Sequence, residues 1–162
     1  MLIMEIAIVV GIIAIILIGL SSASCNSGCC STISSLISAV TGKMNFSEIQ
    51  VYAANAGFTG NDLNTATAIA LAESSGNPIA VGDVTLAPTK GPSIGLWQIN
   101  IGSKAHGSQY TQAELFDPQT NADAAYAIYE ASGNTFSAWS TYTSLAYIKY
   151  LPAGSSCCNT EA

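Results

Sequence analysis

Glu73 is the first candidate for acid–base chemistry, because it follows an apolar, alanine-rich segment and precedes a break in the chain. The break is the run SSGNP, in which Pro78 cannot continue a helix and favours extended geometry at the residue before it. We therefore expect Glu73 in the last turn of a helix that faces a core. Poor hydration raises the pKa of such a carboxyl group toward the range of a general acid. The alternative is a solvated glutamate near a helix end.

A second polar group follows in the run PSIGLWQIN, which ends at Asn100. In this run Gln98 and Asn100 alternate with Trp97 and Ile99. Such alternation is typical of an extended segment with one face toward a core and the other toward solvent or a cleft. Gln98 and Asn100 are therefore candidate ligand-binding residues on a cleft wall.

Together these segments resemble the catalytic core of the lytic transglycosylases and goose-type lysozymes, enzymes that cleave the glycan strands of peptidoglycan. Members carry an E-S-x-x-N-P-like turn and then S-x-G-L-M/W-Q-I, and this chain has ESSGNP and SIGLWQI. A third family feature, L-x-D-P-x-x-N, is present as LFDPQTN and runs on to Ala125 and Tyr129. A fourth, W-x-x-Y, is present as Trp139–Tyr142. The resemblance covers roughly residues 60–151.

The resemblance implies a role for each of these residues. Glu73 would protonate the leaving oxygen and then act as base, without a second catalytic carboxylate, while the N-acetyl group of the substrate assists. Ser93 would orient that N-acetyl group, Gln98 would bind sugar, and Tyr142 would hydrogen-bond near the acid. Trp97 replaces the more usual Met and could stack on a sugar or fill the core. After Tyr142 the chain reads TSL instead of the family's N-x-G, which leaves Tyr147 as an alternative.

Asp83 is the other carboxylate that could reach the cleft. In the family that the chain resembles, the 6-hydroxyl group of the muramic residue closes an anhydro ring. As a second catalytic group Asp83 would favour hydrolysis over this ring closure, whereas the alternative is an ordinary turn aspartate after Gly82. His106, the only histidine, is interpreted as a loop residue, since no nucleophile elbow accompanies it. We expect no metal and no cofactor.

The domain is predicted to be mainly helical, an α+β lysozyme-like fold with a small β-hairpin or extended lobe. Cap and breaker residues set the expected boundaries. We expect a first helix capped by Ser47 and ending at Ala56, and a second capped by Asn61 and reaching Glu73. A third should be capped by Asp117 and reach Ser132, and a last should run from Thr143 to Leu151. We also expect a capping box at Thr111–Glu114 and the hairpin or lobe at Ile79–Lys90, folded over the cleft.

An apolar segment at residues 2–20 is long enough to span a bilayer, with Glu5 near one end. The competing interpretation is a cleaved signal peptide, but no Lys or Arg precedes the apolar run. We predict a transmembrane anchor at residues 1–20, a Ser/Gly/Cys-rich linker at 21–45, the catalytic domain at 46–151 and a tail at 152–162.

The five cysteines lie only in the linker and the tail. This distribution predicts at least one disulfide between the two groups, and unpaired thiols or palmitoylation sites are the alternative. Adjacent cysteines lack the spacing of zinc ligands. The residues are Cys25, Cys29 and Cys30 in the linker and Cys157 and Cys158 in the tail.

The sequence thus predicts a single-pass membrane protein that cleaves the glycan strands of peptidoglycan as a lytic transglycosylase. An anchored minimal enzyme suits the virion membrane of a bacteriophage, with other virion or membrane proteins as possible partners. The alternatives are a bacterial inner-membrane enzyme with its domain in the periplasm, a hydrolytic lysozyme, and an inactive structural or wall-binding protein. A net charge of -6 without any Arg argues against a nucleic-acid partner.

Overall fold

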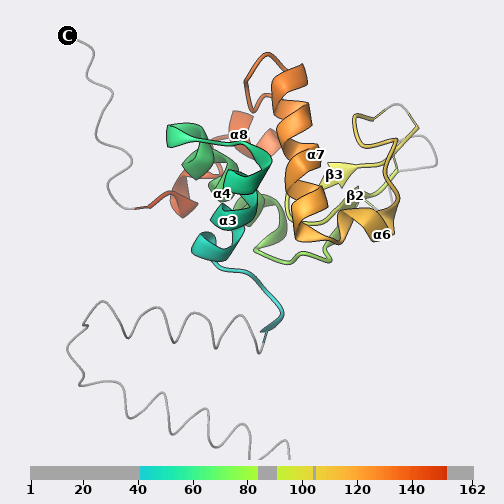
Figure 1. The fold of residues 1–162 in the computed structure, drawn as a ribbon, viewed down its shortest axis with the longest axis horizontal. Coiled ribbons are helices and arrows are strands. Elements are labelled where there is room, and N and C mark those ends of the chain that lie inside the picture. Colours follow the sequence, from blue (N-terminus) through green and yellow to red (C-terminus); the bar gives the residue numbers. More distant parts are fainter. Residues whose placement is uncertain (1–40, 84–90, 104, 153–162) are drawn as a thin grey trace, which may run out of the picture. The chain divides into compact units, whose positions relative to one another are not determined.

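Helices α4, α7 and α8 and a small antiparallel sheet form the part of the chain that positions the site (Figure 1). The computed structural model describes residues 41–83, 91–103 and 105–152, all within the compact unit Ser35–Ala162. This helix-rich arrangement with a small sheet fits the predicted α+β lysozyme-like class. The elements are α3 (Phe46–Ala56), α4 (Gly60–Ser74), β1 (Val81–Gly82), β2 (Ser93–Ile94), β3 (Ile99–Asn100), α6 (Gln112–Leu115), α7 (Pro118–Ala131), α8 (Ser140–Thr143) and the 3-10 helix η1 (Ile148–Tyr150).

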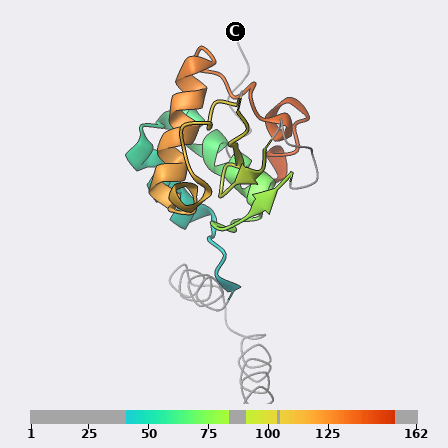
Figure 2. The same ribbon diagram turned by 90° about the vertical axis from the view of Figure 1, so that its right-hand side faces the viewer.

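Helix α4 carries the candidate acid and lies among α3, α8 and η1 (Figure 2). It ends one residue after Glu73, as predicted, because Ser75 adopts the left-handed conformation with φ 52°. Gly76 then has φ 77°, and a Cβ at this position would collide with the carbonyl oxygen of Met44. The carbonyl of Gly76 accepts a hydrogen bond from the Met44 amide at 2.7 Å. The glycine therefore lets the chain before α3 close against the end of α4.

The predicted N-caps of the first two helices were each wrong by two residues. Helix α3 is capped by Asn45 instead of Ser47, because Asn45 and Glu48 form a reciprocal capping box. Helix α4 follows Thr59, and Asn61 lies inside it. The buried Phe58 fixes the chain just before this helix, since its amide donates to Ala53 in the turn that closes α3.

The predictions for α6 and α7 are confirmed to within a residue. Thr111 and Glu114 form the expected capping box at the start of α6. The carboxylate of Asp117 accepts a hydrogen bond from the Thr120 amide, and Pro118 occupies the first turn of α7. The predicted stripe on α7 packs inward, with Ala122, Ala125 and Tyr129 buried and Tyr126 half-buried.

The sheet has the order β1-β2-β3, and all its pairs are antiparallel. Across it, Gly82, Ser93 and Asn100 stand in one row. Within the hairpin or lobe predicted at 79–90, the structure has an extended strand at β1, which pairs with β2 outside that segment. Residues 84–90 lie outside the described residues.

Trp97, in the turn between β2 and β3, joins three parts of the fold. Its backbone amide donates to the side chain of Asn121 at 2.9 Å, and its ring N–H donates to the carbonyl of Ala66 in α4 at 2.9 Å. Its carbonyl accepts from the ring N–H of Trp139 at 2.9 Å. The amide of Asn121 also donates to Ile94 and Leu115, both at 2.9 Å. A buried hydrogen-bond network thus ties α4, α7, the sheet and the start of α8 together.

The predicted last helix, Thr143–Leu151, was wrong. The chain forms the short helix α8 and the turn η1 instead, and Leu145 between them has φ 62°. A left-handed residue ends a helix. The reversal lets the ring of Tyr147 stack on that of Tyr142 with centroids 5.2 Å apart.

The anchor predicted at residues 1–20 and the tail predicted at 152–162 lie outside the described residues, apart from residue 152, as does the linker before residue 41. The same is true of all five cysteines, so the predicted disulfide stays a prediction. In ranges 41–83, 91–103 and 105–152, no helix is both long and apolar enough to cross a membrane.

Replacing Asn121 should show how much the fold depends on the buried hydrogen-bond network around Trp97 and Asn121. Asn121→Ala leaves three buried backbone groups without their partner, and each such group costs about 1–3 kcal/mol. We expect the free energy of unfolding of the full chain to fall by about 3 kcal/mol, measured by urea denaturation. The control is Asn55→Ala, which removes only an exposed hydrogen bond to Gln119 and should change stability by about 0.5 kcal/mol or less. A loss below about 1 kcal/mol for Asn121→Ala would contradict this account.

Candidate active site

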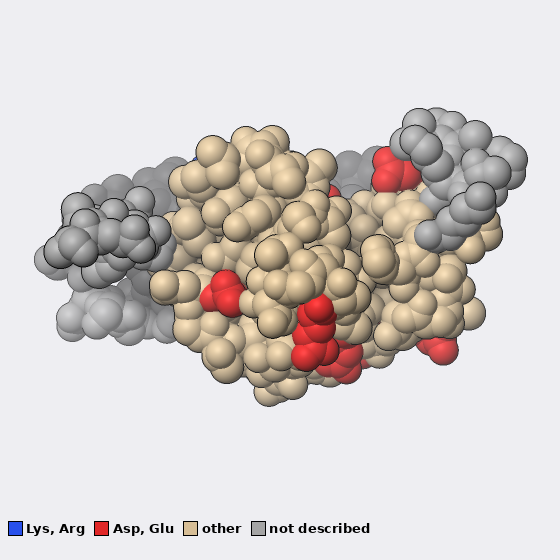
Figure 3. Space-filling view, turned by 90° about the horizontal axis from the view of Figure 1, so that it is seen from above, with Lys and Arg blue, Asp and Glu red and all other residues tan. Residues whose placement is uncertain are grey.

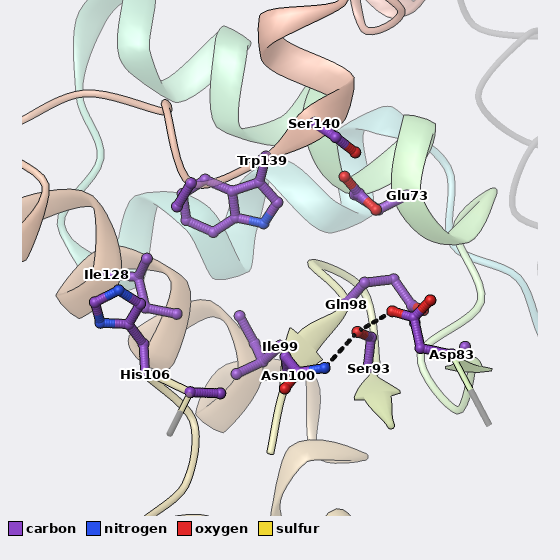
Figure 4. Close-up of a pocket in the computed structure, with 13 residues that line it drawn as sticks. Glu73, Asp83, Ser93, Gln98, Ile99, Asn100, His106, Ile128, Trp139 and Ser140 are labelled. Atoms are coloured by element: carbon purple, nitrogen blue, oxygen red, sulfur yellow. Dashed lines mark hydrogen bonds between the residues drawn. The ribbon is translucent and has the colours of Figure 1, made fainter. Parts of the chain in front are cut away.

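A cleft of about 460 Å³ lies between the end of α4, the sheet and the start of α8 (Figure 4). The structure brings five of the predicted site residues together in its lining and leaves out two, Trp97 and Tyr142. The five are Glu73, Asp83, Ser93, Gln98 and Asn100.

Glu73 is a partly desolvated carboxyl group at the end of α4. Burial raises its pKa above the ordinary value of 4.5, hydrogen bonding by Thr141 lowers it, and the negative charge of Asp83 raises it. The net effect of these three influences is a raised pKa for Glu73. Its Oε1 accepts a hydrogen bond from the Thr141 hydroxyl at 2.6 Å. A carboxyl group with a raised pKa that borders a cleft has the properties of a general acid.

Asp83, Ser93 and Asn100 form a chain of hydrogen bonds on the opposite wall (Figure 4). The Ser93 hydroxyl donates to Asp83 Oδ2 at 2.7 Å, and the amide of Asn100 donates to Ser93 Oγ at 3.3 Å and to the carbonyl of Gly91 at 3.0 Å. The row of paired residues across the sheet places Ser93 beside Asn100. Asp83 follows this row directly and has φ 58°. The wall therefore presents oxygen atoms whose orientation is fixed.

Gln98 is held by the backbone. It adopts a left-handed φ of 48°, and its amide nitrogen donates to Gly95 at 2.9 Å and to Ala80 at 3.4 Å. Its carbonyl oxygen lies against Gly82, where a Cβ would collide with it. Gln98 therefore ties β1 to the turn after β2, and Oε1 remains as the atom that can accept a hydrogen bond from a ligand.

Trp97 fills the core and does not stack on a ligand. Its side chain is 1% exposed and its ring N–H is bonded to Ala66, so no ring face is available at the cleft. Of the two roles that the sequence left open for Trp97, the structure supports core packing.

Tyr142 does not lie at the cleft either, and Tyr147 does not replace it. The ring of Tyr142 lies between Tyr147 and Phe136, with centroid distances of 5.2 and 5.6 Å. The hydroxyl group that meets Glu73 belongs to the preceding residue, Thr141.

Sequence reasoning missed two polar residues near the acid and underestimated His106. Thr141 and Ser140 lie inside the W-x-x-Y segment, which gave a signal for the segment but not for these residues. His106 lines the cleft because the amide of Gly107 donates to Asn100 at 3.1 Å and so pins this loop to β3. The cleft lining also contains apolar residues, namely Ile99, Ala105, Ile128, Ala138 and Trp139.

Charge is sparse around the domain. On the face shown in Figure 3, separate acidic side chains interrupt a mostly uncharged surface. Among the residues that the structure describes, no three His, Cys, Asp or Glu side chains are grouped so that they could hold a metal ion. The site can therefore supply a proton from Glu73 and hydrogen bonds from a polar wall to a neutral, hydroxyl-rich ligand.

This combination of a helix-rich α+β fold and a carboxyl group with a raised pKa at a polar cleft defines a lysozyme-like glycan-cleaving class. A family model described as a lysozyme-like domain matches residues 50–141, more than half of the chain, and the chain belongs to this family. The match contains Glu73, the polar wall and Thr141. Membership places the chain among peptidoglycan-cleaving enzymes in general. Searches among curated proteins and solved structures give no match.

The raised pKa of Glu73 predicts a pH-dependent gain in stability for Glu73→Gln. A raised pKa in the folded state gives stability that is fully present below pH 4.5 and is lost as pH rises through the folded pKa. The unfolding free energy of Glu73→Gln relative to the wild type should therefore increase as pH rises from below 4.5 to above the raised pKa of Glu73 in the folded state, as measured by urea denaturation.

Glu114 offers a matched control of opposite sign. Hydrogen bonds from the backbone and side chain of Thr111 lower its pKa, so its contribution is present above pH 4.5 and is lost as pH falls. Glu114→Gln should lose stability relative to the wild type as pH rises from below the lowered folded pKa of Glu114 to above 4.5. Parallel pH dependence in the two variants would show that Glu73 is not desolvated as described.

Proposed function

We propose that this protein is a peptidoglycan lytic transglycosylase with Glu73 as its acid and base. The observation that carries the proposal is the carboxyl group of Glu73, which is partly buried, has a raised pKa, and borders a cleft with a fixed polar wall. Because a general acid must be protonated at working pH, this environment suits the first step of glycosidic cleavage.

In the proposed reaction Glu73 gives its proton to the oxygen between MurNAc and GlcNAc, and the bond from that oxygen to C1 breaks. The carbonyl oxygen of the substrate's N-acetyl group supports the positive charge at C1. Glu73, now a carboxylate, takes the proton of the 6-hydroxyl group of the same MurNAc. The 6-oxygen bonds to C1 and closes a 1,6-anhydro ring. The proton first donated stays on the hydroxyl group of the released GlcNAc, the proton taken from the 6-hydroxyl group regenerates the neutral Glu73, and no water is consumed.

The polar wall would bind the sugar during this sequence. Ser93 is fixed by Asp83 and Asn100, and the side-chain carbonyl oxygen of Gln98 accepts no hydrogen bond from the part of the chain that the structure describes. These groups suit an acetamido or hydroxyl donor on the substrate. Their fixed orientation means that little ordering is needed when the glycan binds.

Hydrolysis is the alternative, and one observation favours it. Asp83 lines the same cleft as Glu73, and its charge contributes to the raised pKa of Glu73. A water held by Asp83 could attack C1 in place of the 6-hydroxyl group, and the product would be a hydrated reducing end.

The proposed setting is a membrane to which residues 2–20 anchor the domain. Of the possible membranes, we favour the virion membrane of a phage. There the enzyme would open the wall locally for genome entry. A bacterial inner membrane with the domain in the periplasm is the alternative. Immunodetection in purified, detergent-sensitive virus particles tests the preference, and absence from such particles would leave the bacterial setting.

The test of the reaction is digestion of purified peptidoglycan by the full chain, with products identified by mass spectrometry without prior reduction. We expect anhydro-muropeptides, and a loss of roughly 100-fold or more in Glu73→Gln, because a general acid contributes about that much to the rate. Glu130→Gln on α7, outside the cleft lining, is the matched control and should release the same products as the wild type.

Two other outcomes would change the assignment. Hydrated ends that disappear in Asp83→Asn would establish the hydrolase. No release by a chain with native circular dichroism would contradict catalysis and favour a wall-binding role.

A further inference from the structure

A single side chain holds the carboxyl group of Glu73. The Thr141 hydroxyl donates to Oε1 at 2.6 Å, and the backbone of Thr141 also hydrogen-bonds the carboxyl group; no other side chain in ranges 41–83, 91–103 and 105–152 hydrogen-bonds it. Helix α8 carries two further aliphatic hydroxyl groups, those of Ser140 and Thr143. Thr143 donates to the carbonyl of Ser140 at 3.1 Å, and the Ser140 hydroxyl lines the cleft without a protein partner among the described residues.

Thr141 is itself fixed from both sides. The preceding Trp139 is 6% exposed and its ring N–H is bonded to Trp97 at 2.9 Å, which anchors the start of α8. The carbonyl of Thr141 accepts a hydrogen bond from the amide of Tyr147 at 3.3 Å. A β-branched side chain also has few χ1 choices. The hydroxyl is therefore held where it meets Glu73.

This contact makes the two oxygens of Glu73 chemically different. Oε1 accepts the Thr141 proton, so in the neutral acid the carboxyl proton belongs on Oε2. The carboxyl cannot turn about its own axis without losing a short hydrogen bond.

We propose that Thr141 is a positioning residue that directs the proton-bearing oxygen Oε2 of Glu73 to the glycosidic oxygen of the substrate. This inference rests on the proposed function of Glu73 as the acid. Thr141 acts through Glu73 and need not touch the glycan. It takes the place beside the acid that the family resemblance gave to Tyr142.

The same hydrogen bond has a consequence that a merely structural contact lacks. A donor to the ionised form lowers a pKa, so Thr141 opposes the effect of burial on Glu73. Removing the hydroxyl should raise the pKa of Glu73 further. Because the acid must be protonated, the decline of activity at high pH should then begin at a higher pH in the variant.

The experiment compares Thr141→Val, Thr141→Ser and Thr143→Val in the full chain. Thr141→Val keeps the shape and removes the hydroxyl, and we expect a rate roughly 10-fold lower at the optimum together with a basic limb shifted to higher pH. Thr141→Ser should restore both properties. Thr143→Val removes an equivalent hydroxyl from the same helix without touching Glu73, and its rate and pH profile should match the wild type.

A second measurement separates failure of this inference from failure of the proposed function. The Glu73 carboxyl carbon is titrated by ¹³C NMR in the glutamate-labelled full chain and assigned by its disappearance in Glu73→Gln. Its pKa should rise in Thr141→Val and stay unchanged in Thr143→Val, whether or not the protein cleaves peptidoglycan. If Thr141→Val slows the reaction but moves neither the titration nor the pH profile, the contact is only structural and the inference is overturned.

Discussion

Burial of Trp97 is the constraint on which the site depends. Its amide, ring N–H and carbonyl each hold a different element, through Asn121 of α7, Ala66 of α4 and Trp139 before α8. Each of these hydrogen bonds is buried. A polar group without a partner in such a place lowers stability much more than one exposed to water. The helix that carries the acid, the sheet that forms the polar wall and the short helix that carries Thr141 are consequently held at fixed positions relative to one another.

The glycine before Trp97 is part of the same constraint. Gly95 has φ 75°, and a Cβ there would collide with the amide of Asn121. Only glycine allows both the backbone conformation and this close approach. The sequence G-L-W-Q therefore combines three requirements: a tight turn, a buried ring that joins the helices, and a glutamine whose amide closes the turn onto the backbone of Gly95 and Ala80. A motif that reads as a ligand-binding segment is to a large extent structural.

Sequence reasoning located the cleft well because its residues adjoin breaks in regular structure. Glu73 precedes a helix end, Asp83 follows β1, and Ser93 and Asn100 face each other across a strand pair. Such positions are fixed by local signals, since proline, glycine and alternation act over a few residues. The role of Trp97 was left open by the sequence for a different reason. Alternation places Trp97 on the face opposite to Gln98, but only the position of α4 shows that the opposite face is fully enclosed.

The C-terminal part shows where local signals were insufficient. Thr141 and Tyr142 are neighbours, and adjacent residues on a helix point about 100° apart. Whichever of them faces Glu73, the other must face elsewhere. The choice is made by where α8 begins, which depends on the buried bond from Trp139 to Trp97, and by the left-handed Leu145, which brings Tyr147 back onto Tyr142. Both contacts join residues that sequence patterns treat as independent. Tyr142, which the resemblance placed near Glu73, is thus used for packing, and a threonine one position earlier supplies the hydroxyl group that meets Glu73.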